Sequence, residues 1–157
     1  MAATAAIVLT GCELPWSAFE AEDPVAIRAS SGEVEVLLVP CSPAGITSLH
    51  VTGVRETAES RDYPRVWQVD FSPPATDLRR VVLGQVPPGG TERVPWPPAG
   101  LDSLGQEYGY IVQVQLDGGD HWIQGFRQQN LTEGRILFHN ESLSPDAFAD
   151  KSRCPGP

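Results

Sequence analysis

Histidine is the residue type in this chain best suited to acid–base or metal chemistry, because imidazole gains and loses a proton near neutral pH. The chain has His50, His121 and His139, each alone in or beside a segment that we expect to be a strand. Sites can assemble from distant residues, so an enzyme site built from these histidines and nearby carboxylates is one interpretation. A surface or edge-strand position for each is the other. GxSxG, HExxH, GxGxxG and phosphate-loop motifs are absent from the sequence, and we expect no catalytic residue and no cofactor.

The densest group of candidate metal ligands is Asp117, Asp120 and His121. Two carboxylates and an imidazole in one short segment could bind a hard cation. Aspartates are also favoured in hairpin turns, and Gly118 and Gly119 between them supply the positive φ that such turns need. We therefore expect a turn at this position and no metal site.

Composition argues against a nucleic-acid partner. Asp and Glu number 20 against 11 Lys and Arg, which gives a formal charge of −9 and a pI of about 4.6. Binding to a phosphate backbone needs clustered Lys and Arg. With 157 residues, of which 41% are hydrophobic, the chain suffices for one domain with its own core.

Apolar residues alternate with polar ones in short runs bounded by Gly and Pro, which is typical of strands in an all-β domain. In one run, Val34, Val36 and Leu38 alternate with Glu33 and Glu35, which we place on the opposite face. The runs, about nine in number, lie at 25–27, 34–38, 49–51, 67–71, 81–83, 93–94, 110–116, 122–126 and 136–138.

Short antiparallel strands with one buried and one wet face favour a two-sheet β-sandwich over a barrel. Sustained helical periodicity is lacking, and we expect one helical turn within Ser144–Ser152, after Pro145. The fold class predicted is therefore all-β.

Residues 104–114 read LGQEYGYIVQV, with Leu104 followed six positions later by Tyr110 and then by Val112 and Val114. This pattern resembles the tyrosine corner of immunoglobulin-like and fibronectin type III domains. The resemblance implies that the Tyr110 hydroxyl binds backbone at a strand corner while the ring joins the core. It implies an immunoglobulin-like architecture and no particular function.

Trp96 is the candidate ligand-binding residue. It lies between Val94 and Pro98 in the segment VPWPP, where the prolines prevent regular strand pairing and hold the indole on an extended segment. Such an indole could stack on a glycan or a peptide. It could equally pack over an open end of the sandwich.

Residues 2–9 read AATAAIVL, an apolar run too short to span a membrane but suited to the core of an export signal. It ends in Leu9-Thr10-Gly11-Cys12, which resembles the lipobox of bacterial lipoproteins. The resemblance implies cleavage before Cys12 and acylation of its thiol. Neither Lys nor Arg precedes the run, which leaves open a start upstream of Met1. Ten arginines against the single Lys151 resemble the composition of small lipoproteins from high-GC Gram-positive bacteria.

If lipid occupies Cys12, Cys41 and Cys154 remain, and an even number of thiols in an exported chain predicts a disulfide. Two unpaired buried thiols are the alternative. The spacing excludes a CxxC redox or zinc motif.

Together these observations predict three segments: a lipoprotein signal peptide over 1–11, an acidic tether over 12–23 and a β-sandwich domain over 24–157. The function expected is that of a binding or scaffolding protein, anchored outside the cell membrane through acylated Cys12. Its partner would be an unidentified envelope protein or glycan. The competing expectation is an envelope enzyme or accessory subunit that uses the histidines.

Overall fold

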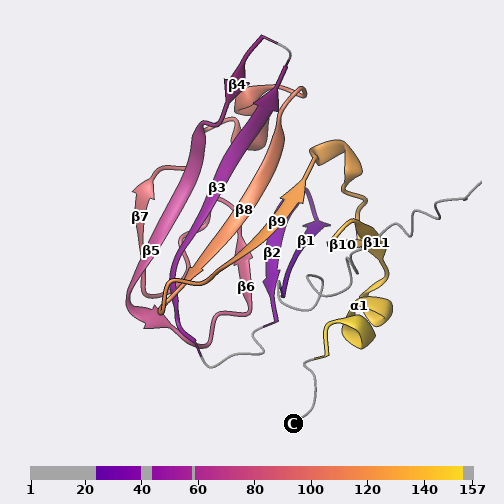
Figure 1. Ribbon diagram of the computed structural model, residues 1–157. Coiled ribbons are helices and arrows are strands. Elements are labelled where there is room, and N and C mark those ends of the chain that lie inside the picture. The colour runs from indigo at the N-terminus through magenta and orange to yellow at the C-terminus, as the bar shows by residue number, and fades with distance from the viewer. Residues whose placement is uncertain (1–23, 40–43, 58, 154–157) are drawn as a thin grey trace, which may run out of the picture.

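The protein is a β-sandwich of two antiparallel sheets, seen in a computed structural model that describes residues 24–39, 44–57 and 59–153 (Figure 1). The five-stranded sheet has the order β11-β10-β1-β2-β6. Its strands are β1 (Val25–Ser30), β2 (Glu33–Leu38), β6 (Arg80–Val82), β10 (Ile136–Phe138) and β11 (Glu141–Leu143). The predicted all-β, two-sheet fold is confirmed.

The second, six-stranded sheet has the order β7-β5-β3-β8-β9, with β4 paired to the end of β3. Its strands are β3 (Ile46–Glu56), β4 (Arg61–Asp62), β5 (Arg65–Ala75), β7 (Gly90–Val94), β8 (Gly109–Leu116) and β9 (His121–Phe126). Strands β1, β2 and β6 follow the A-B-E order, and β3, β8 and β9 the C-F-G order, of immunoglobulin-like sandwiches. The edge strands of the two sheets are β11, β6, β7 and β9.

Three short helices complete the described chain: η2 (Gly100–Leu104), η3 (Gln128–Asn130) and α1 (Pro145–Lys151). The helical turn predicted over 144–152 is confirmed as α1, where the Ser144 side chain caps the backbone N–H of Ala147 at 3.2 Å. Within the described residues, none of these helices is both long and apolar enough to cross a membrane.

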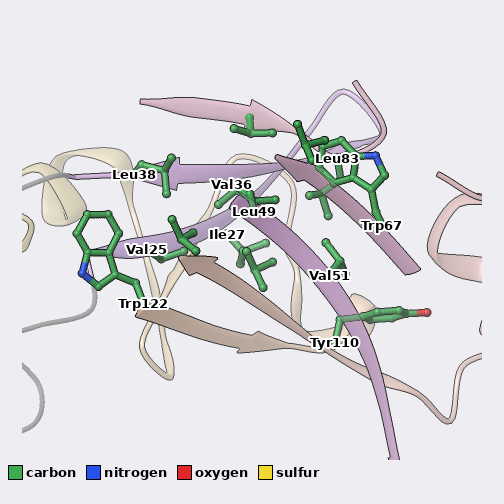
Figure 2. Packing of buried hydrophobic residues seen from close by; sticks show 14 of the residues in the cluster. Val25, Ile27, Val36, Leu38, Leu49, Val51, Trp67, Leu83, Tyr110 and Trp122 are labelled. Carbon is green, nitrogen blue, oxygen red and sulfur yellow. The ribbon is translucent and has the colours of Figure 1, made fainter. Parts of the chain in front are cut away.

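The core lies between the sheets and is filled mainly by the apolar sides of β1, β2, β3, β5, β8 and β9 (Figure 2). Trp67 is fully buried in this core, and its indole N–H donates to the Glu92 carboxylate at 2.8 Å. Figure 2 places Val25, Leu38 and Trp122 towards one end of the core and Val51 and Tyr110 towards the other. The sandwich therefore has two distinct ends, one of which contains the start of β1.

The tyrosine corner that the sequence predicts is present. Tyr110 is buried beside Phe126, with ring centroids 5.4 Å apart, and its hydroxyl donates to the backbone carbonyl of Leu101 in η2. Burial raises the pKa of Tyr110, so the hydroxyl remains protonated and able to donate. This bond fixes η2 to the start of β8.

Two expectations about strands need correction. Eleven strands are described instead of about nine, because β4 and β11 are too short and polar to show alternation. Glu35, which alternation places on the face opposite Val36, does lie there but is only 4% exposed, because Arg28 binds its carboxylate. Ile136 pairs with Arg28 and so faces outward, away from the core between the sheets, yet it too is buried.

Candidate functional site

The three histidines do not meet. His50 on β3 and His121 on β9 lie on the outer face of the six-stranded sheet, two strands apart, because they pair with Gln113 and Gln115 of β8 between them. His139 lies in the turn between β10 and β11, on the other sheet. Across the described parts of the chain, no three His, Cys, Asp or Glu side chains are grouped to hold a metal ion.

His50 is half-buried, and its Nε2 lies 3.1 Å from the side-chain oxygen of Gln113. Burial lowers its pKa, and the positive charge of Arg65 lowers it further. Both effects favour the neutral imidazole, which lies in a polar row of the sheet.

The predicted turn at Asp117 is confirmed. Gly118 and Gly119 have φ of 110° and 96° and join β8 to β9. The Asp117 carboxylate accepts the backbone N–H of Gly45 at 3.0 Å, and the Asp117 N–H donates to the Gly45 carbonyl at 2.8 Å. Its carboxylate thus fastens the start of β3 to the hairpin.

Trp96 lies against the open edge of the core. Its ring meets Trp67 edge-on, with centroids 5.8 Å apart. Gly84, with φ of 82°, lies so close that a Cβ there would stand 2.6 Å from the indole, and Gly100 is also near the ring. The half-buried indole therefore packs on three neighbours, and one part of it remains open to solvent.

The predicted lipid and disulfide residues, Cys12, Cys41 and Cys154, lie outside the described residues.

The structure reveals a site that the sequence analysis missed: a polar cavity of about 210 Å³ between η2, η3 and the start of β8. Its lining residues are Asp102, Gln106, Tyr108, Gln128 and Gln129. The amide nitrogen of Gln128 donates to the Asp102 carboxylate at 3.2 Å, which bridges η3 to η2. The cavity is thus lined by one carboxylate, three carboxamides and one aromatic ring.

The aromatic wall of this cavity is held from behind. The Tyr108 hydroxyl donates to the Asp62 carboxylate on β4, and the Arg55 guanidinium lies 5.0 Å from the centre of the Tyr108 ring. Arg55 also forms ion pairs of 3.7 Å with Asp62 and with Glu107. The hydrogen bond to Asp62 raises the pKa of Tyr108, so its phenol stays neutral. The ring is therefore fixed before any ligand arrives.

A glycine in β3 sets how closely η2 approaches the sheet. A Cβ on Gly53 would stand 2.3 Å from Leu104 and 3.2 Å from Tyr108. A larger residue here would force the Leu104 side chain to move away from the strand. Together with the bond from Tyr110 to Leu101, this contact positions the loop that carries Asp102 and Gln106.

The cavity lies at the end of the sandwich away from the start of β1. Tyr108 and Asp102 adjoin Tyr110 and Leu101, and Tyr110 marks the end of the core opposite Val25 (Figure 2). A second, wider cavity of about 480 Å³ follows β5, lined mainly by Pro73, Pro74, Leu78 and Pro88. Because Ala75 in this lining pairs with Ile46 at the start of β3, this second cavity lies at the other end, with the hairpin of Asp117.

Sequence reasoning missed the polar cavity because carboxamides form no catalytic motif, and because its residues come from two loops that only the fold brings together. The sequence did contain one signal for its position, because the tyrosine corner predicts that the loop before β8 folds back against the start of that strand. Comparisons with protein-family models, curated proteins and solved structures found no match to this chain.

Proposed function

We propose that this protein is a binding or scaffolding module of the cell envelope, held outside the membrane by lipid on Cys12. The observation that carries this proposal is the separation of two features in the sandwich. The tether over residues 12–23 would join the domain at Val25, and the polar cavity lies at the opposite end. A domain anchored in this way presents the cavity away from the membrane.

The length of the tether suits such an arrangement. A dozen residues span at most about 40 Å when fully extended, at about 3.3–3.6 Å each. The domain would therefore stay close to the lipid surface while its distal loops reach partners in the envelope. A diacylglyceryl group supplies two acyl chains, which is enough for stable anchoring.

A disulfide between Cys41 and Cys154 belongs to the same proposal. Cys41 follows β2 after Val39, and Cys154 follows α1 directly after Arg153. In the chain-entropy model a bond closing so long a loop stabilises the fold by about 4–5 kcal/mol.

The deciding experiment is the intact mass of the protein extracted from its native host, measured before and after reduction and thiol alkylation. We expect a chain that begins at Cys12, carries diacylglyceryl mass, and gains two alkyl groups only after reduction. An unlipidated chain that retains Met1–Gly11 would contradict the proposed anchoring.

A matched pair of variants tests the anchor in cells. Cys12→Ser removes the acceptor thiol and should move the protein from the detergent phase to the aqueous phase. Cys41→Ser also removes one thiol but should leave the protein in the detergent phase. Equal partitioning of the two variants would exclude a specific role for Cys12.

A further inference from the structure

The side chains that line the polar cavity favour some classes of ligand over others. Its charged lining residue is the Asp102 carboxylate, and the neighbouring charges of Asp62 and Glu107 are paired with Arg55. Lys and Arg are not among the residues that line it. An anionic ligand would therefore meet the Asp102 charge with no Lys or Arg among the lining residues to offset it.

An apolar ligand fits no better. The carboxamides of Gln106, Gln128 and Gln129 offer both N–H donors and carbonyl acceptors. Covering them with an apolar group would remove their hydrogen bonds to water without replacing them, which costs free energy. The lining therefore favours a ligand that can donate and accept hydrogen bonds around its whole surface.

The volume of the polar cavity and its position between loops further restrict the class of ligand. A volume of about 210 Å³ is below the roughly 300–1,000 Å³ of sites for drug-sized ligands, so one small unit fits. The cavity lies between loops and not along a strand edge, where an extended peptide would add to a sheet. Tyr108 closes one side of the cavity, but it is only 7% exposed, so the polar groups and not an open ring face must hold a ligand.

We propose that this cavity binds a single neutral sugar unit, free or at the end of a glycan. Asp102 would accept hydrogen bonds from two neighbouring hydroxyls, and the carboxamides would satisfy the others. The bond from Gln128 to Asp102 holds these groups in place before binding. This inference rests on the proposed binding role and assigns that role a ligand class.

The test is a titration of the full chain, followed by the ¹⁵N and ¹H shifts of the side-chain amides of Gln106, Gln128 and Gln129. The probes are glucose, galactose, mannose and N-acetylglucosamine, with inorganic phosphate, ethylammonium and N-acetylglycinamide as competing chemistries. We expect at least one sugar to give saturable shifts with a dissociation constant of about 1 mM, the range for a ligand of about a dozen non-hydrogen atoms.

Variants locate the site. Gln128→Ala should weaken sugar binding about tenfold, because it removes one amide and frees Asp102. Gln85→Ala is the matched control, since Gln85 also makes one exposed hydrogen bond, of 2.8 Å to Glu33, away from the cavity. Gln129→Ala is a second test that spares the fold, because the Gln129 side chain makes no hydrogen bond to the rest of the described structure.

The inference is wrong if no sugar gives saturable shifts at concentrations up to about 100 times the expected dissociation constant. It is also wrong if only phosphate, ethylammonium or N-acetylglycinamide saturates the shifts, or if Gln128→Ala and Gln85→Ala weaken sugar binding equally. The anchor is tested separately. If the chain from the native host binds sugar but carries no lipid on Cys12, this inference stands and the proposed anchor is wrong. If that chain carries lipid but binds no sugar, the anchor stands and only this inference is wrong.

Discussion

The two outer faces of the sandwich are built in contrasting ways. On the six-stranded sheet the outward residues of the central strands are mostly polar, with His50 and Gln113 side by side, and Ile123 nearby is 40% exposed. On the five-stranded sheet the outward row includes buried Ile136 and Glu35, and Phe138 meets Phe148 of α1 edge-on at 5.3 Å. The outer face of the six-stranded sheet has no such packing in the described structure, whereas α1 packs on the outer face of the five-stranded sheet.

The contrast shows what alternation in a sequence can and cannot decide. A period of two separates the two faces of a strand, because successive side chains point to opposite sides. This alternation identifies the core side of a strand only when the other side is exposed to solvent. Where a helix packs on the outer face, as α1 does on β10, both faces of the strand are at least partly buried, and alternation no longer identifies the core side.

The sharpest test of this contrast is to remove one apolar side chain from each face. Phe138→Ala should lower the free energy of unfolding by about 2–3 kcal/mol, because it removes a packed ring and its contact with Phe148. Ile123→Ala should cost less than about 1 kcal/mol, because Ile123 is already 40% exposed. Urea unfolding measures both, and equal losses would mean that the two faces do not differ.

A second pair compares two glutamates of β2 that alternation treats alike. Glu35→Ala should cost about 2 kcal/mol, since it leaves the Arg28 guanidinium without its carboxylate in a partly buried position. Glu33→Ala should change stability by less than about 0.5 kcal/mol, because its bond to Gln85 is exposed. Thermal unfolding of the two variants gives the comparison, which fails if the glutamates behave alike.

A third test addresses the joint between the sheets. The buried Gln124 side chain of β9 accepts the His139 N–H at 3.0 Å and donates to the His139 carbonyl at 2.8 Å, which fastens the β10–β11 turn. Gln124→Leu should cost about 1–2 kcal/mol by leaving these backbone groups unpaired. Gln113→Leu, on the outer face of the six-stranded sheet, should cost less. Hydrogen exchange of the His139 amide should accelerate only in the first variant.

The smallest expected effect concerns pH. The pKa of His50 is lowered in the folded protein by burial and by Arg65, although the hydrogen bond with Gln113 and the charge of Asp70 act in the other direction. The unfolded chain then binds the proton more readily, so stability should fall as pH drops below about 6.5. His50→Gln should flatten that slope in urea midpoints measured from pH 5 to 8, and an unchanged slope would assign the effect to other groups.

Much of the fold could be predicted from the sequence where local chemistry is unambiguous. The strand ending at Leu116, the glycine turn after it and the capped helix after Ser144 each follow from residues that have few alternatives. Strand β4 could not be predicted, because Arg61 and Asp62 pair with β3 only through the geometry of the loop.

The candidate site, in contrast, could not be predicted from the sequence. The residues with the strongest chemical character, the histidines, lie apart, and the cavity is formed by glutamines with no individual signal. Trp96 was predicted from its prolines to leave regular pairing, and it does, but its surroundings depend on Gly84 in the turn after β6 and on Trp67 of β5. Such contacts are set by tertiary packing and not by local sequence.

The edge strands of both sheets bear on how this domain behaves when many copies are crowded together. Unpaired strand edges invite other chains to add to a sheet and polymerise. Here β6 and β11 are each three residues long, and β9 lies against β1 of the facing sheet. Strand β7 carries Glu92 and Arg93 and has prolines on both sides. Each edge is thus short, charged or close to the facing sheet, so we expect the domain to resist edge-to-edge aggregation when crowded.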